Sequence, residues 1–146
     1  MRLGFYILDV PVRYTIKNTV VRGPLGYLLR KTGAVAIARE RPNANRSSYT
    51  DMMTDIITSM SRVAMIITPE GTRSKTTQWK TGFYYVAKNT NVPIALGYLD
   101  YERKVAGIGM IINPTNIEDD MKLVMEFYRS ISPKISDRFA LDERYV

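Results

Sequence analysis

The feature that most constrains the fold is an apolar run that stops abruptly at a proline. Residues 63–68 read Val-Ala-Met-Ile-Ile-Thr, and Pro69, Glu70 and Gly71 follow directly. A strand with one solvent-exposed face alternates between apolar and polar residues. This run is almost continuously apolar, so it indicates a strand that is covered on both faces. Such strands occupy the centre of parallel sheets. We therefore expect an α/β domain with a largely parallel or mixed sheet flanked by helices.

Short strands and helices alternate along the rest of the chain, as this fold class requires. The helix at 48–62 carries a methionine-rich face that we expect in the core, and the strand at 92–99 reads as buried. Thr115 and Glu118 have the spacing of a capping box at the start of the last helix. The other predicted elements are strands at 10–17, 34–38 and 104–113 and helices at 22–33 and 82–91.

The length of 146 residues corresponds to one domain. We expect that domain at 1–136 and a frayed C-terminal tail at 137–146. Residues 1–8 read as the end of a helix whose beginning is missing, so the start looks internal. The longest apolar runs are far shorter than the roughly 20 residues that a membrane-spanning helix needs, so no transmembrane helix is predicted.

The chain contains neither cysteine nor histidine. It therefore cannot build an ordinary zinc site, a Ser-His dyad or an imidazole general base, and we expect no metal. Its net charge of +7 comes from one segment, because eight cations and one acid lie between Arg13 and Arg46. A localised cationic face suits an anionic membrane surface or nucleic acid, although it can also be a solubilising surface without a partner.

The loop after the apolar run has the composition of an anion site. Arg73 presents a planar fork of donors that can hold two phosphate oxygens, and Lys75 and Lys80 add positive charge. Glu70 would repel a phosphate unless it orients Arg73 or accepts a proton from a substrate hydroxyl. The alternative is a solvated turn in which Glu70 and Arg73 only pair with each other.

The residues of this loop also carry a family resemblance. Pro69–Ser74, followed by Trp-Lys-Thr-Gly-Phe at 79–83, resembles the signature block of the glycerol-phosphate and lysophospholipid acyltransferase family. Residues 33–39 are similar to the family's Gly-x-x-x-apolar-Asp-Arg block, with Ala38 in place of the aspartate. Val-Pro-Ile at 92–94 is similar to its apolar-Pro-apolar block. The resemblance implies an acyltransferase-like fold over most of the chain.

By this resemblance, Gly71, Thr72 and Arg73, with Glu70 positioning them, would bind the phosphate and glycerol of lysophosphatidate or a related lysophospholipid. Arg39 would lie on the same side of the sheet. The acyl donor would be acyl-CoA or acyl carrier protein, acting as a substrate, and no other cofactor is implied. The resemblance further implies phospholipid biosynthesis at the cytoplasmic face of a membrane, with peripheral attachment to an anionic surface. The oligomeric state is left open.

One family block cannot exist in this sequence. The family's His-x-x-x-x-Asp block supplies the general base, and the chain has no histidine. Loss of a general base costs about 10²–10⁴ in rate. Family members carry this block just before the segment that resembles residues 1–8, so we expect it to be encoded upstream of Met1. The alternatives are a non-catalytic relic that binds lipid phosphate and a nucleic-acid module. No recognisable nucleic-acid motif supports the latter, so nucleic acid is not an expected partner.

Overall fold

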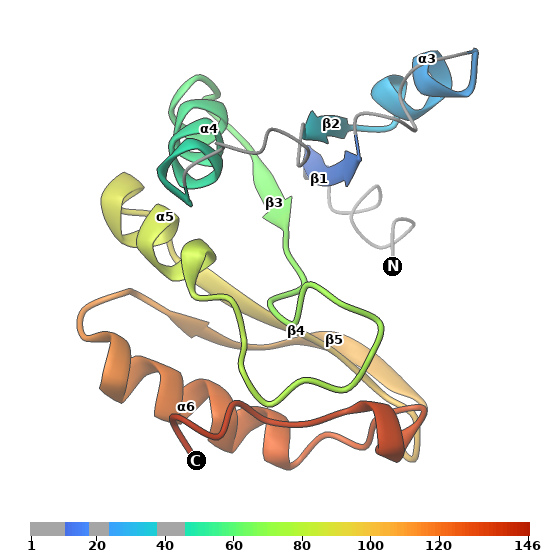
Figure 1. Cartoon of the computed structure of the whole chain (residues 1–146), viewed down its shortest axis with the longest axis vertical. Coiled ribbons are helices and arrows are strands. Elements are labelled where there is room, and N and C mark those ends of the chain that lie inside the picture. The colour runs from blue at the N-terminus through green and yellow to red at the C-terminus, as the bar shows by residue number, and fades with distance from the viewer. Residues whose placement is uncertain (1–10, 18–23, 38–45) are drawn as a thin grey trace. The chain divides into compact units, whose positions relative to one another are not determined.

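The computed structural model describes residues 11–17, 24–37 and 46–146 (Figure 1). The chain divides into two compact units between Ile67 and Thr68. The first unit contains a small parallel sheet with helices, and the second contains an antiparallel hairpin with helices. The predicted mixed α/β class is therefore confirmed. The predicted helix end at 1–8 lies outside the described residues.

The sheet of the first unit has three parallel strands in the order β2 (Ala34–Ile37), β1 (Val12–Lys17) and β3 (Ala64–Ile66). Tyr14 in the middle of β1 lies opposite Ala34 on one side and Ile66 on the other. Within the apolar run at 63–68, Ala64–Ile66 therefore forms an outer strand of the three-stranded sheet that the described residues build, and not the central strand that we expected. The elements of the unit are β1 (Val12–Lys17), α3 (Pro24–Lys31), β2 (Ala34–Ile37), α4 (Arg46–Thr58) and β3 (Ala64–Ile66).

The turn between α3 and β2 depends on glycine. Gly33 has φ +90°, and a Cβ there would lie 2.3 Å from the Val12 carbonyl oxygen. Only glycine fits both the left-handed backbone and the close approach of the neighbouring strand. Proline begins the preceding helix at Pro24, where its missing N–H costs nothing. In α4, Met53 of the predicted apolar face is fully buried.

The second unit is built on the hairpin of β4 and β5. The two strands pair from Ile94–Ile112 to Asp100–Val105, with an irregularity between Leu96 and Gly97. In β4 only Leu96 and Asp100 are buried, so the strand is covered on one face and the expectation of a fully buried strand is wrong. The elements are α5 (Gly82–Thr90), β4 (Ile94–Asp100), β5 (Val105–Ile112), α6 (Ile117–Arg129) and the 3₁₀ turn η1 (Ser136–Arg138).

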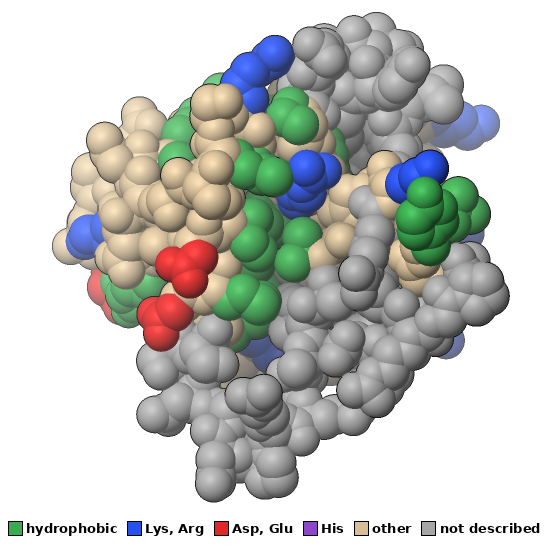
Figure 2. Space-filling view, turned by 90° about the horizontal axis from the view of Figure 1, so that it is seen from above, with side chains coloured by type: hydrophobic (Ala, Val, Ile, Leu, Met, Phe, Trp, Pro, Cys, Tyr) green, Lys and Arg blue, Asp and Glu red, His purple; other side chains and the backbone are tan. Residues whose placement is uncertain are grey.

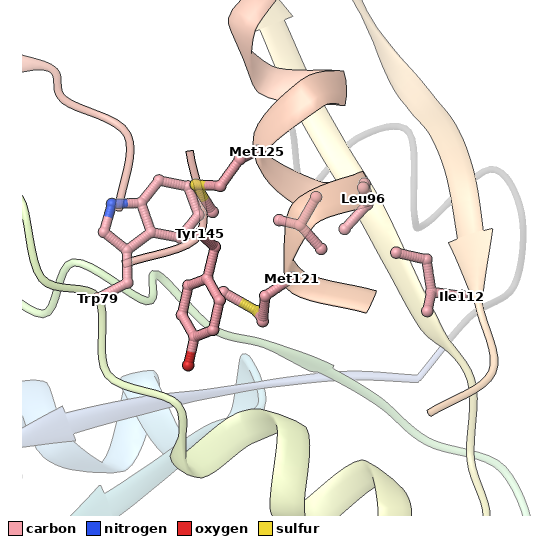
Figure 3. Close-up of a cluster of buried hydrophobic side chains, with 7 residues drawn as sticks. Trp79, Leu96, Ile112, Met121, Met125 and Tyr145 are labelled. Carbon is pink, nitrogen blue, oxygen red and sulfur yellow. The ribbon is translucent and has the colours of Figure 1, made fainter. Parts of the chain in front are cut away.

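The core of the second unit joins α6 to the hairpin and to segments distant in sequence. Figure 3 shows Met125 beside the ring of Trp79 and Met121 beside Tyr145. The predicted apolar face of α6 is confirmed, because Met121 and Val124 are buried. The buried members of this cluster are Trp79, Leu96, Ile112, Met121, Val124, Met125 and Tyr145.

The start of α6 differs from the predicted capping box. Asn116 is the N-cap, and its side-chain oxygen accepts the backbone N–H of Glu118 at 2.9 Å. Thr115 instead donates its own N–H to Asp120 at 2.7 Å. Asp120 also accepts the hydroxyl of Tyr84 at 2.6 Å, which ties α5 to α6. Burial and the neighbouring Asp120 raise the pKa of Tyr84 well above its usual value. Across the described ranges, every helix is too short or too polar to cross a bilayer.

Gly109 in β5 allows α6 to pack closely on the hairpin. A Cβ at this position would lie 2.4 Å from Cε2 of Phe127, so Gly109→Ala must push the aromatic ring or the strand aside. We expect a loss of roughly 1–3 kcal/mol in the free energy of unfolding, as overpacking typically costs. Gly97→Ala is the matched control, because its Cβ would meet nothing closer than 4.0 Å. Equal losses for the two variants in urea denaturation would contradict this packing.

Candidate functional site

The predicted anion loop is closed by two backbone hydrogen bonds. The N–H of Gly71 donates to the Thr68 carbonyl at 3.1 Å, and the N–H of Lys80 donates to the Pro69 carbonyl at 2.8 Å. The second bond brings the two ends of the loop together, so residues 70–79 project from a fixed base. We call residues 68–80 the signature loop. All of it lies in the second unit.

Gly71 is required by the shape of this loop. Its φ of +62° falls in the left-handed region, which side-chain-bearing residues rarely adopt. A Cβ at Gly71 would also lie 2.9 Å from the Nζ atom of Lys80. The Lys80 side chain therefore passes directly over the glycine, and the bare backbone lets a cation come close to the first turn of the loop.

The charged side chains of the signature loop face solvent. Arg73, Lys75 and Lys80 are exposed, whereas Glu70 is half-buried. The Arg73 side chain makes no hydrogen bond or ion pair with any residue that the structure describes. The alternative of a closed Glu70–Arg73 pair is therefore not what the structure shows. Thr72 accepts the backbone N–H of Ser74 at 3.1 Å, which holds the turn around Arg73.

The negative charge of Glu70 acts on Tyr128 in α6. Burial of the Tyr128 ring and the negative charge of Glu70 raise the pKa of Tyr128 to about 12. The Tyr128 hydroxyl donates to the Gly97 carbonyl at 2.9 Å, and its ring meets Trp79 edge-on with centroids 5.7 Å apart. The charge of Glu70 thus favours the protonated form of Tyr128, and Arg73 has no hydrogen-bond or ion-pair partner among the described residues.

The far end of the signature loop is held by the C-terminus. Trp79 is only 4% exposed, and its backbone N–H donates to Asp142 at 3.0 Å. Its indole N–H donates to the Ala140 carbonyl at 3.1 Å. The expectation of a frayed tail is therefore wrong, because Asp142 is fully buried and Tyr145 is in the core. The apolar residues Phe139, Ala140, Leu141 and Tyr145 are the sequence signal that could have indicated a packed segment.

Acid should weaken the contacts that Asp142 makes. Burial opposes its ionisation, but hydrogen bonds from Arg144 and the Trp79 N–H outweigh burial and hold the pKa below its usual 3.8. The pKa values of Asp100 and Asp120 are lowered too. Because these pKa values fall on folding, their stabilisation is present above 3.8 and is lost as the pH drops toward the lowered values. The free energy of unfolding should fall steeply there, and less steeply in Asp142→Asn. Identical pH profiles would contradict a native-state role for this carboxylate.

Two predicted features depend on residues that the structure does not describe. Arg39 lies outside the described residues, so its expected position on the same side of the sheet as the signature loop remains a prediction. Of the cations between Arg13 and Arg46, only Arg13 and Lys31 have described side chains. The face displayed in Figure 2 carries both acidic and basic side chains, and most of the basic ones lie apart from the acidic ones. The described residues contain no group of side chains that could hold a metal ion.

A comparison with protein families identifies the chain. The model of the Acyltransferase family matches residues 3–95, which is more than half of the sequence. The chain belongs to the Acyltransferase family. Within this acyltransferase-family chain the match includes the whole signature loop and position 39, and it ends inside β4. The α6 helix and the C-terminal residues that hold the loop lie beyond the matched region. Searches of curated proteins and of solved structures found no match.

Proposed function

We propose that this acyltransferase-family chain binds a lysophospholipid acceptor, lysophosphatidate or a close relative, through the signature loop. The acyl donor in the proposed reaction is acyl-CoA or acyl carrier protein. The observation that carries the proposal is the Arg73 guanidinium, which is exposed and unpaired among the described residues on a loop fixed at both ends. A guanidinium in this state is ready to bind a phosphomonoester through two parallel hydrogen bonds.

The other loop residues would support the same anion. Lys80 passes over Gly71 and adds a second positive charge near the first turn. The Thr72 hydroxyl accepts from Ser74, which leaves its own proton available for an acceptor oxygen. In the proposal Glu70 positions the loop, as the family resemblance implies, and its charge also acts on Tyr128. In the proposal Arg39 is a second guanidinium for the same phosphate.

In the proposed reaction the acceptor hydroxyl attacks the carbonyl carbon of the acyl thioester. An ester bond forms, the carbon–sulfur bond breaks, and the thiol leaves with the proton that the hydroxyl gave up. A general base would accelerate this proton transfer by about 10²–10⁴. The 146-residue sequence holds no imidazole, so we expect transfer by this chain to be slower by that factor than transfer assisted by a histidine base.

The proposed place of action is a membrane surface. The acceptor is an amphiphile, so an enzyme that uses it works where the lipid lies. The cations between Arg13 and Arg46 would attract an anionic surface such as the cytoplasmic leaflet, with each contributing about 1 kcal/mol near the surface. We therefore propose peripheral attachment at the cytoplasmic face and a role in phospholipid biosynthesis.

A second candidate function is lipid-phosphate binding without transfer. The observation that favours it is the absence of histidine from a sequence that retains the signature loop. Both functions predict acceptor binding, and they differ only in whether a product forms.

The test is to incubate the protein with lysophosphatidate and acyl-CoA and to measure phosphatidate by mass spectrometry. Slow product formation that Arg73→Ala abolishes is the result expected for the transferase. Binding of lysophosphatidate with no product above the protein-free rate would support the binding protein instead. Failure to bind lysophosphatidate at all would overturn both.

A further inference from the structure

The C-terminal residues 140–144 form a clasp on the signature loop. Asp142 is fully buried, and its two oxygens accept from Arg144, with Nε at 2.9 Å and Nη2 at 2.6 Å. The same carboxylate accepts the backbone N–H of Trp79 at 3.0 Å. One buried acid thus joins the end of the chain to the end of the loop. We call these five residues the clasp.

Further bonds attach the clasp to the loop backbone. Nη2 of Arg144 also donates to the Trp79 carbonyl at 2.6 Å. The N–H of Glu143 donates to the Thr77 carbonyl at 3.0 Å, and the Ala140 carbonyl accepts the indole N–H of Trp79. Three of these contacts reach main-chain atoms of the loop, counting the bond from the Trp79 N–H to Asp142. They fix the path of the backbone, which burial of an apolar ring alone would not do.

The clasped residues stand next to the closed base of the loop. Trp79 is followed by Lys80, whose N–H bonds to Pro69, and six residues before Trp79 stands Arg73. The segment of the loop that leads to Lys80 is therefore held by hydrogen bonds at both Thr77 and Trp79. Without these bonds the loop would keep its base but lose the attachment between the base and Arg73.

We propose that Asp142 and Arg144 are positioning residues that hold the signature loop in the shape that presents Arg73 to a phosphomonoester. The inference rests on the proposed function for its ligand, and on the hydrogen bonds of the clasp for its geometry. Residues outside the family-matched region would thus complete the acceptor site. A displaced positioning group lowers binding and rate without touching substrate.

The chain offers a closely matched control. Asp100 is also a buried aspartate, 3% exposed, and it is paired with Arg103 at 2.8 Å, but this pair lies at the far turn of the hairpin and has no bond to the signature loop. Asp142→Asn and Asp100→Asn each remove one buried charge from an arginine pair in the same unit. Only the first should disturb the loop. Arg144→Ala is a second variant that breaks the clasp. Its side chain is 43% exposed, so the fold should tolerate its loss more easily than a change at the buried Asp142.

The first measurement is hydrogen exchange of the backbone amides in residues 70–80 without ligand. Exchange should be faster in Asp142→Asn and Arg144→Ala than in the wild type or Asp100→Asn. The second is binding of lysophosphatidate, which should weaken roughly tenfold in the two clasp variants and less than twofold in Asp100→Asn. Melting temperatures are recorded for all four proteins, since a loss of binding that only follows the melting temperature would overturn the proposal.

The outcomes separate the inference from the proposed function. Unchanged exchange in the loop overturns the clasp. Faster exchange with normal binding shows that the clasp holds the loop but does not position Arg73, and it also overturns the proposal. If exchange is faster in the clasp variants but the wild type binds no lysophosphatidate, the proposed function is overturned. The hydrogen bonds of the clasp then still hold the loop, but they do not serve an acceptor site.

Discussion

Replacing Arg73 with alanine is expected to weaken the binding of lysophosphatidate roughly 10- to 100-fold, because a hydrogen-bonded charge pair of this kind contributes about 1.5–3 kcal/mol. The side chain is exposed and has no partner among the described residues, so its removal should leave the fold intact. The measurement is a binding titration with monomeric short-chain lysophosphatidate at fixed ionic strength. Arg73→Lys should retain part of the affinity, since it keeps the charge but not the fork of donors.

The control for this prediction is Arg129→Ala. Arg129 is an exposed arginine at the end of α6, so the substitution changes the net charge by the same amount without touching the signature loop. Its affinity for lysophosphatidate should stay within about twofold of the wild type, because exposed charges at a distance are largely screened by salt. Equal losses in the two variants would show that overall charge, and not Arg73, determines binding.

The largest expected effect on stability comes from Met121→Ala. Met121 is fully buried in the cluster that joins α6 to Trp79, Tyr145 and the hairpin (Figure 3). Truncation removes buried contacts and leaves a cavity, so the free energy of unfolding should fall by roughly 2–5 kcal/mol. Small domains have only about 5–15 kcal/mol in total, so the second unit should come close to unfolding.

Trp79 provides the readout, because it is the only tryptophan in the chain and lies in the same cluster. Its fluorescence in urea reports the unfolding of the second unit directly. Leu123→Ala on the same helix is the control, since Leu123 is 46% exposed and lies off the buried face. A change of about 0.5 kcal/mol or less is expected there. Similar losses for both variants would contradict the burial of Met121.

Local patterns in the sequence predicted most elements of the fold. Helical spacing identified the buried face of α6, and the glycine at 33 marked the end of α3. The errors concern the environment of elements, not their type. The run at 63–68 is as apolar as a central strand but forms an outer strand of the described sheet. An apolar run indicates that a strand is buried, but it does not indicate which other strands or helices cover it.

The cap of α6 shows a second kind of error. Thr115 and Asn116 are both good capping residues, and sequence spacing favoured the first. The structure uses Asn116 because Asp120 takes the N–H of Thr115 while also binding Tyr84 from α5. The choice is made by a contact between helices, which the local sequence does not contain.

The candidate site likewise has one part that the sequence predicted and one part that it did not. Its charged residues lie close together in the sequence, so the loop from Glu70 to Arg73 could be recognised from sequence alone. The clasp could not, because Asp142 follows Trp79 by 63 residues and no local period connects them. A buried aspartate near a chain end looks like any solvated acid until its hydrogen bonds are seen. Long-range polar contacts of this kind need coordinates.

The most direct test of the central claim is the ratio of two affinities in the wild-type protein. Binding is measured for lysophosphatidate and for the monoacylglycerol of the same chain length, which differs only by lacking the phosphate. The account predicts that the phosphate-bearing lipid binds at least about tenfold more tightly, and that Arg73→Ala removes most of this difference. Equal affinity for the two lipids would contradict a phosphate site in the signature loop.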